Sequence, residues 1–311
     1  NVDIFILHPH NRVSEVQRRQ MTTVDEANVH NVAVAGTFDD CQAMVKAMFN
    51  DLEFRDELNL AAINSINWVR ILAQTVYYAY AALALGSPAR PVSFAVPTGN
   101  FGNVYSGYVA TRLGLPIRHL MVATNANDIL ARFFNGAGYY KNGVVASISP
   151  SMDIQIASNF ERLVFELQER NSAAVRDLMS SLDQHSGFEV PQDKLELARH
   201  LFSGQRVNDT RALECMARVW RECGILIDPH SAAGVAAAED TLAHQETGAR
   251  QTAMICLATA HPAKFPDAVE QATAIRPVLP DRFANLLQRP EHMTHLPNDL
   301  AVVKEFVQAC A

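Results

Sequence analysis

The chain has few cysteines, an excess of acidic over basic residues, and no long uninterrupted apolar run. The five cysteines are scattered, and none has CxxC spacing, which argues against a structural zinc site and favours reduced thiols in a cytoplasm. Lys and Arg total 26 against 33 Asp and Glu, so the net charge of −7 gives no basic surface for nucleic acid. No stretch approaches the roughly 20 apolar residues that span a bilayer. These absences predict a soluble, cytoplasmic globular protein with no nucleic-acid or membrane partner.

Short apolar runs alternate along the chain with segments whose apolar residues recur at helical spacing. The runs are Ile4–Leu7, Val29–Val34, Val92–Val96, Ile117–Val122 and Ala253–Ala258. Alternating strands and helices in short units are typical of a parallel sheet joined by helical crossovers. The 311 residues are enough for about two domains of usual size. The pattern therefore predicts an α/β protein whose strands are largely buried.

The stretch Val92–Val109 combines a strand, a glycine loop and a helix. The strand is broken at Pro97, a polar loop runs from Thr98 to Asn103, and apolar residues then resume at helical spacing. Two glycines three residues apart allow successive backbone N–H groups to turn inward, and the helix N-terminus adds partial positive charge. The spacing favours a phosphate site, and an ordinary strand-to-helix turn is the alternative, because the motif matches neither the P-loop nor the dinucleotide fingerprint.

A second polar cluster opens the long helical pattern that begins near residue 64. Asn64 or Ser65 is a natural N-cap. Side chains on a helix lean toward its N-terminus, so Arg70 can reach back to the same end, where backbone donors are free. A cap, a guanidinium and a helix dipole together would make a second anion site. The alternative is a capped helix with an arginine on its solvated face.

Polar residues also follow two other predicted strands. Asn125–Asp128 come after Ile117–Val122, at the sheet edge where open α/β proteins keep their ligands, although Asn127 and Asp128 could equally cap a helix. The strand Ala253–Ala258 delivers Thr259 and His261 to its carboxyl end. His261 and His230 are acid/base candidates by their ordinary pKa range, and the alternative for each is a hydrogen-bonded structural histidine.

Five motifs together resemble those of the threonine synthases, which are pyridoxal 5'-phosphate enzymes of the two-domain fold type II (tryptophan-synthase-β-like). They are INSINWVR, PTGNFGN, GLPI, ATNANDI and ATAHPAKF, in that order along the chain. The resemblance implies an α/β fold of parallel sheets flanked by helices. It also implies an incomplete smaller domain over residues 1–85, and a larger domain over 86–311 that carries the cofactor loop.

The resemblance implies which phosphate each of the two anion sites binds. In that family the glycine loop receives the cofactor phosphate, which here implies Gly99, Asn100, Phe101, Gly102 and Asn103, and a threonine at the position of Thr259 bonds the pyridine nitrogen. Asn64, Ser65 and Arg70 match the residues that hold the substrate phosphate. The implied reaction is a lyase reaction that converts O-phospho-L-homoserine and water to L-threonine and phosphate, in a monomer or a homodimer.

The family's catalytic lysine has no counterpart in the sequence. In threonine synthases this lysine forms a Schiff base with the cofactor and lies in an N-terminal segment with a Phe-Lys-Asp pattern. The lysines present are Lys46, Lys141, Lys194, Lys264 and Lys304, and none has that context. The chain also begins at Asn1 and enters an apolar run within three residues. We therefore expect a threonine synthase without its N-terminal portion, with no catalytic residue of its own and inactive alone.

Three other functions are compatible with parts of the pattern. Another fold-type-II enzyme, such as a threonine dehydratase or a cysteine synthase, would share the cofactor loop. It would need no second phosphate-binding site, because its substrate carries no γ-phosphate. A non-catalytic module that binds a phosphate ligand would explain the missing lysine. A nucleotide-binding oxidoreductase is disfavoured, because the glycine pattern differs and no acidic ribose partner is present.

Overall fold

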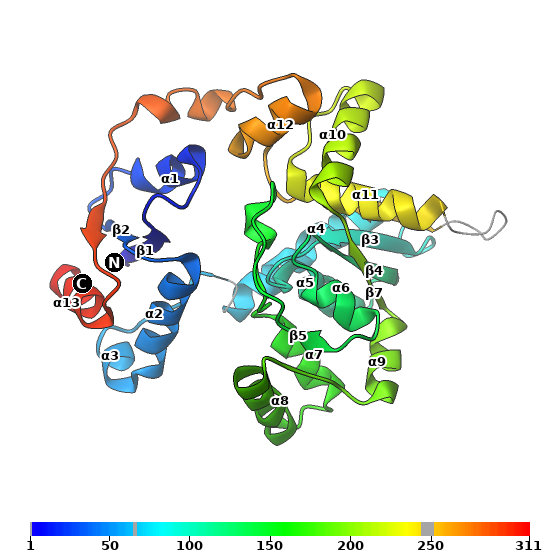
Figure 1. Cartoon of the computed structure of the whole chain (residues 1–311), viewed down its shortest axis with the longest axis horizontal. Helices are drawn as coiled ribbons and strands as arrows, with labels where there is room; N and C mark the ends of the chain where they lie inside the picture. The colour runs from blue at the N-terminus through cyan, green and yellow to red at the C-terminus, as the bar shows by residue number, and fades with distance from the viewer. Residues whose placement is uncertain (1, 65–66, 244–251) are drawn as a thin grey trace. The chain divides into compact units, whose positions relative to one another are not determined.

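The computed structural model describes residues 2–64, 67–243 and 252–311, and it divides into two compact units (Figure 1). The first unit consists of Asn1–Ala61 and Val278–Ala311, and the second of Ala62–Pro277. This division differs from the expected boundary near residue 85. The long helix before that boundary packs within the second unit, and the C-terminal segment returns to the first unit through strand pairing.

The first unit is a small parallel α/β layer. Its three-stranded sheet has the order β1-β2-β9, with β1 at Ile4–Pro9, β2 at Val29–Val34 and β9 at Thr294–Leu296. Its helices are α1 (Glu15–Thr22), α2 (Phe38–Asn50), α3 (Leu52–Glu57) and α13 (Leu300–Cys310), and short 3-10 turns lie at Asp281–Phe283 and Leu286–Gln288. The apolar core lies between β2 and the helices α2, α3 and α13. Thr37 begins α2 with a capping box closed by Asp40.

The C-terminal segment is fixed to α1 by a cluster of charge-assisted hydrogen bonds. Arg18 donates from Nε to Glu291 Oε2 at 2.7 Å, and Thr22 Oγ1 donates to the same oxygen at 2.7 Å. The Arg18 guanidinium is the main cause that lowers the pKa of Glu291 to about 2. The C-terminal segment is therefore an integral part of the first unit.

The second unit is built on a four-stranded parallel sheet in the order β7-β4-β3-β8. The strands are β3 (Val92–Pro97), β4 (Ile117–Thr124), β7 (Phe202–Arg206) and β8 (Ala253–Cys256). Its helices are α4 (Trp68–Ala84), α5 (Gly102–Arg112), α6 (Ile129–Phe134), α7 (Phe160–Leu167), α8 (Ser172–His185), α9 (Gln192–Arg199), α10 (Asp209–Cys223), α11 (Pro229–Ala243) and α12 (Pro266–Thr273). A two-stranded antiparallel ribbon, β5 (Tyr139–Tyr140) with β6 (Gly187–Phe188), and 3-10 turns at Pro150–Met152 and Pro262–Lys264 complete it.

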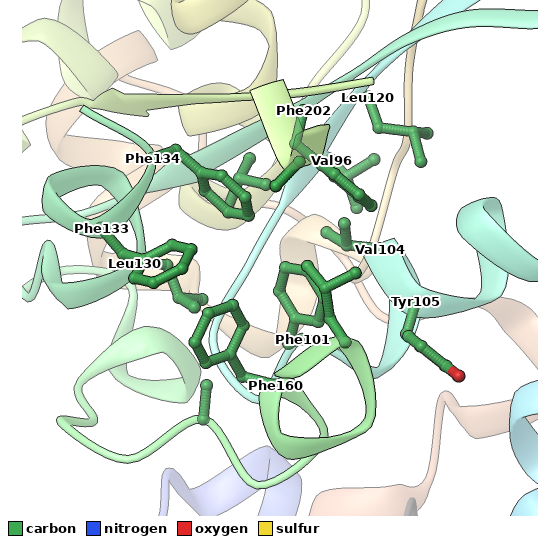
Figure 2. Packing of buried hydrophobic residues seen from close by; sticks show 14 of the residues in the cluster. Val96, Phe101, Val104, Tyr105, Leu120, Leu130, Phe133, Phe134, Phe160 and Phe202 are labelled. Carbon is green, nitrogen blue, oxygen red and sulfur yellow. The ribbon is translucent and has the colours of Figure 1, made fainter. Parts of the chain in front are cut away.

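Each face of this sheet carries its own apolar cluster, because successive strand side chains point to opposite faces. Phe94 and Val96 of β3 pack with α4 through α9, whereas Ala95 between them packs with α10, α11 and α12. The first cluster is rich in aromatic rings, and Figure 2 shows Phe101 and Phe160 packed together at its centre. This aromatic cluster supports the glycine loop that follows β3.

Two strands predicted as buried are only partly so. Residues Ile4 to Leu7 of β1 are half-buried, and β8 is exposed at Ala253 and half-buried from Met254 to Cys256. Both lie at the edge of their sheets, so one side of each lacks a neighbouring strand among the described residues. Uniform apolarity predicted their strand character correctly but not their position in the sheet.

Within the described ranges, neither unit contains a helix both long and apolar enough to cross a membrane. No group of three or more His, Cys, Asp or Glu side chains in the same ranges could hold a metal ion.

Candidate functional site: a phosphate loop and a second helix start

The loop after β3 lies at the carboxyl edge of the sheet, as its sequence predicts. The Thr98 backbone N–H donates to Ala123 O at 2.8 Å, and the Thr98 hydroxyl donates to Val96 O at 2.6 Å. The first bond continues the strand by one residue, and the second ties the Thr98 side chain back to the strand, so together they fix where the chain leaves the sheet. Helix α5 then begins at Gly102.

The loop presents a row of backbone donors. From Gly99 to Val104, no backbone N–H group donates to an acceptor among the residues that the structure describes. The residue before α5 is Phe101, which has the left-handed conformation (φ 64°) and provides no side-chain cap. A non-glycine residue at positive φ is uncommon and costs about 1–3 kcal/mol. A left-handed residue directly before a helix is a conformation that allows successive backbone N–H groups to converge on an anion.

Gly99 is required by a close approach of another backbone segment. A Cβ at this position would lie 2.8 Å from Ser151 O and 3.3 Å from Met152 Cα. The turn Pro150–Met152 is held in turn by His230, whose Nε2 accepts the Ser151 backbone N–H at 3.2 Å. The glycine in this loop thus allows a supporting segment to lie directly against it.

The two asparagines of the loop face different partners. Asn100 O accepts the Asn159 backbone N–H at 3.0 Å. Asn103 Oδ1 accepts the Tyr77 hydroxyl at 2.6 Å, and Asn103 O accepts the Tyr78 hydroxyl at 2.8 Å. Burial raises the pKa of Tyr78 well above its ordinary value, so its hydroxyl remains a donor. These bonds attach the first turn of α5 to α4.

Helix α4 begins at a different residue from the one expected. Asn67 is the N-cap, and its Oδ1 accepts the Val69 backbone N–H at 2.9 Å. Asn64 and Ser65 were the expected caps; the Asn64 carbonyl accepts the Asn67 backbone N–H at 3.1 Å, whereas Ser65 lies outside the described residues. The motif INSINWVR contains an asparagine at both positions, and the second of them is the cap.

Arg70 turns back toward the start of α4, as predicted. Its Nη1 donates to Ile63 O at 2.8 Å, and the side chain is otherwise exposed. The rings of Trp68, the first residue of α4, and Tyr105, in the first turn of α5, lie with centroids 6.3 Å apart. The starts of α4 and α5, where the two anion sites are predicted, therefore lie close together.

The end of β8 is supported by a buried polar cluster at the start of α11. Asp228, His230 and Ser231 are all buried, and Asp228 accepts from the backbone N–H of His230 at 2.9 Å and from the Ser231 hydroxyl. The Ser231 hydroxyl oxygen also accepts the Thr259 backbone N–H at 3.0 Å. The Thr259 side chain is exposed, and its hydroxyl has no partner among the described residues.

The structure favours structural roles for both candidate histidines. His230 Nε2 accepts a backbone N–H, so the proton lies on Nδ1, which donates to Asp228 Oδ1 at 2.9 Å. His261 caps the short turn Pro262–Lys264, where Nδ1 accepts the Ala263 backbone N–H at 3.1 Å. Each ring nitrogen that the structure shows bonded is used to hold backbone or another side chain.

A network of polar side chains fixes the segment that lies against Gly99. The sequence pattern singled out Asn125 and Asn127 of this network but not Asp153. Asn125 Nδ2 and Asn127 Nδ2 donate to Asp153 Oδ1 at 2.7 and 3.0 Å, and the Ser147 backbone N–H donates to Asp153 Oδ2 at 2.9 Å. Asn127 and Asp128 do not cap α6 with their side chains. Sequence spacing gave no signal for Asp153, because its partners come from a distant strand end.

The residues at the loop fit the phosphate of a cofactor. The row of backbone donors and the glycine-permitted close approach are the features that bind a phosphate through the main chain. Asn159 adds a buried amide nitrogen, Nδ2, that has no partner among the described residues. The site is thus rich in donors and poor in acceptors, as a doubly charged oxyanion requires.

Comparison with known proteins identifies the class first. Residues 1–259 match the model of a family described as pyridoxal-phosphate dependent enzyme, and the chain belongs to that family. The fold is therefore the expected fold type II, and the cofactor of the family is the expected pyridoxal phosphate. Residues 231–307 match a second model, described as the C-terminal region of threonine synthase.

The particular relatives are threonine synthases. The chain is 52% identical to threonine synthase of Pseudomonas aeruginosa over 308 residues, which are 99% of this chain and 65% of the relative. It is 40% identical to threonine synthase of Eremothecium gossypii over 332 residues, which cover 99% of this chain and 64% of the relative.

Solved structures of threonine synthases are also similar to this chain. The chain superposes on PLP-bound threonine synthase of Brucella melitensis with a TM-score of 0.90 and 51% identity, over 100% of this chain and 66% of that one. For the yeast threonine synthase the TM-score is 0.87 and the identity 38%, over 99% and 65%. The chain thus spans about two thirds of the length of the relatives that it matches.

Proposed function

We propose that this chain provides the phosphate-binding part of a threonine synthase, a lyase that converts O-phospho-L-homoserine and water to L-threonine and phosphate. The observation that carries the proposal is that the N-termini of α5 and α4 lie close together in the second unit, with the Tyr105 and Trp68 rings 6.3 Å apart. A cofactor and a substrate that each carry a phosphate account for both N-termini. The similarity to threonine synthases supports the same choice.

Each site has proposed residues. Gly99, Asn100, Phe101, Gly102 and Asn103 would hold the cofactor phosphate through their backbone N–H groups. Thr259 would direct its hydroxyl at the pyridine nitrogen, with its backbone fixed by Ser231. Once bound, pyridoxal phosphate would supply an electron-withdrawing ring that stabilises negative charge at the substrate carbons.

The second site would hold the phosphate of the substrate at the start of α4. Arg70 would supply a guanidinium there, and Asn64 and Ser65 would supply polar groups. The contact of Arg70 with Ile63 O supports this placement, because it keeps the guanidinium at the positive end of the helix dipole. A threonine dehydratase or a cysteine synthase would not need this second phosphate-binding site, because their substrates carry no such phosphate.

We further propose that none of the five lysines binds the cofactor covalently, so that the chain alone is inactive. Lys194 and Lys304 form ion pairs with Glu169 and Asp51. Lys264 lies in the turn Pro262–Lys264, in a motif unlike that of the family's catalytic lysine. The proposal includes a cytoplasmic location. It also includes a monomeric or homodimeric state, and gel filtration with light scattering would test that state.

The test of the substrate assignment is the effect of Arg70→Ala on ligand affinity. Calorimetric titration with O-phospho-L-homoserine is expected to show binding weakened by about 10- to 100-fold, because a hydrogen bond to a charged group is worth about 1.5–3 kcal/mol. Binding of L-homoserine, which lacks the phosphate, should not change.

Arg112→Ala is the matched control, because Arg112 lies on an exposed surface in the last turn of α5. An unchanged affinity of Arg70→Ala for O-phospho-L-homoserine would remove the substrate assignment. If the unmodified chain with added pyridoxal phosphate released phosphate from O-phospho-L-homoserine, only the proposal about the lysines would be overturned. Binding of the cofactor with no affinity for O-phospho-L-homoserine would favour a different fold-type-II enzyme or a non-catalytic module.

A further inference from the structure

Residues 158–160 pack directly against the phosphate loop, although neither the sequence motifs nor the family resemblance assigns them a role. The Asn159 backbone N–H donates to Asn100 O at 3.0 Å, and the Ser158 hydroxyl lies 3.4 Å from Asn100 Oδ1. The Phe160 ring meets the Phe101 ring edge to face with centroids 5.3 Å apart, as Figure 2 shows. The start of α7 thus holds the loop at its two central residues.

The amide orientation of Asn159 is fixed by its neighbour on α7. Arg162 Nε donates to Asn159 Oδ1 at 3.0 Å, and a guanidinium can only donate. Oδ1 therefore faces Arg162, and the other end of the amide must be the NH₂ group. The Arg162 guanidinium is itself placed over the Trp68 ring, 5.7 Å from its centroid, which limits its freedom to turn away.

The NH₂ group of Asn159 is left without an acceptor. Asn159 is only 2% exposed, and its Nδ2 has no hydrogen-bond partner among the residues that the structure describes. A buried donor without a partner is costly, so such a group usually has one in the working molecule. The side chain also does not cap α7, which excludes the ordinary explanation for an asparagine at a helix start.

We infer that Asn159 is a further binding residue of the phosphate site, whose Nδ2 donates to an oxygen of the phosphate held by residues 99–103. Arg162 is a positioning residue that keeps the amide in the required orientation. The inference rests on the proposed function, because it assumes that this loop binds the cofactor phosphate. Charge-assisted hydrogen bonds are the strong ones, and the buried position of this donor shields it from competing water.

The test is a calorimetric titration of the whole chain and its variants with 4'-deoxypyridoxine 5'-phosphate. This probe carries the cofactor phosphate but has no aldehyde to react with surface lysines. Asn159→Asp keeps the acceptor for Arg162 and replaces the donor by an acceptor, so we expect at least about tenfold weaker binding. The bond to Arg162 remains in this variant, so we expect it to fold, and its melting temperature measured without the probe would show this.

Three further measurements keep the test specific. Asn171→Asp is the matched control, because Asn171 caps α8, where aspartate caps equally well, and it should bind the probe like the parent chain. Arg162→Gln should weaken binding by a smaller factor, about threefold, because the amide is then free to rotate. Deoxypyridoxine without the phosphate should show no difference between Asn159→Asp and the parent chain.

The outcomes separate this inference from the proposed function. Binding of Asn159→Asp within twofold of the parent chain would overturn the inference and leave the cofactor loop intact. A folded parent chain that does not bind the probe would overturn both. If Asn159→Asp does not fold, Asn159→Ala takes its place: several-fold weaker binding would support the inference, and parent-like binding would overturn it.

Discussion

At the residue scale, the phosphate loop depends on one position where a side chain has no room. A methyl group at Gly99 would lie 2.8 Å from Ser151 O, which is backbone and cannot rotate away. Gly99→Ala is therefore expected to lower the free energy of unfolding by about 1–3 kcal/mol and to displace the loop. Urea denaturation and titration with 4'-deoxypyridoxine 5'-phosphate would measure the two effects, and we expect binding to weaken at least about tenfold.

Gly143→Ala is the matched control for Gly99→Ala, because it tests the backbone preference for glycine without any steric contact of the added methyl group. Gly143 has a positive φ of 81° but nothing within 4 Å of a Cβ, so its substitution should cost only about 1 kcal/mol and leave binding unchanged. If Gly99→Ala bound the probe like the parent chain, the close approach of Ser151 would have no part in shaping the site.

At the element scale, α1 and the C-terminal segment are joined by Glu291, and this joint should be sensitive to acid. The pKa of Glu291 is lowered from 4.5 to about 2, first by its hydrogen bond with Arg18. A lowered pKa in the folded state means that the carboxylate stabilises the fold fully above about pH 4.5, and that this stability is lost as the pH falls toward 2. Glu291→Gln should remove about 1–2 kcal/mol at pH 7 and progressively less below pH 4.5.

The matched control for this joint is an exposed ion pair. Glu222 pairs with Arg218 one helical turn away, with half of its side chain exposed, so Glu222→Gln should change stability by less than about 0.5 kcal/mol at any pH. Urea denaturation of both variants between pH 3 and pH 7 would measure this. A constant deficit for Glu291→Gln across that range would contradict the assignment of the effect to ionisation.

At the scale of the whole molecule, each unit has its own apolar core. Phe54 is buried in the first unit and Phe133 in the second, at 5% and 1% exposure. Phe54→Ala and Phe133→Ala should each cost about 3–5 kcal/mol, because each leaves a cavity in a separate core. Calorimetry should show Phe54→Ala lowering only the transition of the first unit and Phe133→Ala only that of the second. A single transition lowered equally by both variants would mean that the units unfold together.

Much of the local structure could be predicted from the sequence because its causes are local. Thr37 caps α2 with Asp40 three residues further on, the loop after Val96 leads into α5, and Arg70 folds back toward the start of α4. Spacing and capping chemistry act over a few residues, so they are visible without a fold. The same local view placed the cap of α4 at Asn64 or Ser65, because the motif contains several polar residues that can cap a helix and spacing alone does not choose among them.

The sequence alone determined the α/β class, the order of the strands along the chain, and the glycine loop with its helix, since periodicity and backbone freedom are properties of short segments. Only the tertiary structure decided which strands lie at sheet edges, which unit the C-terminal segment joins, and which side chains meet at the loop. Asn159 and Arg162 became candidates only there, because the contact of Asn159 with Asn100 crosses 59 residues of chain and depends on how α7 packs against α5. Hydrophobic burial brings such distant segments together, and no local pattern records the partner that each will meet.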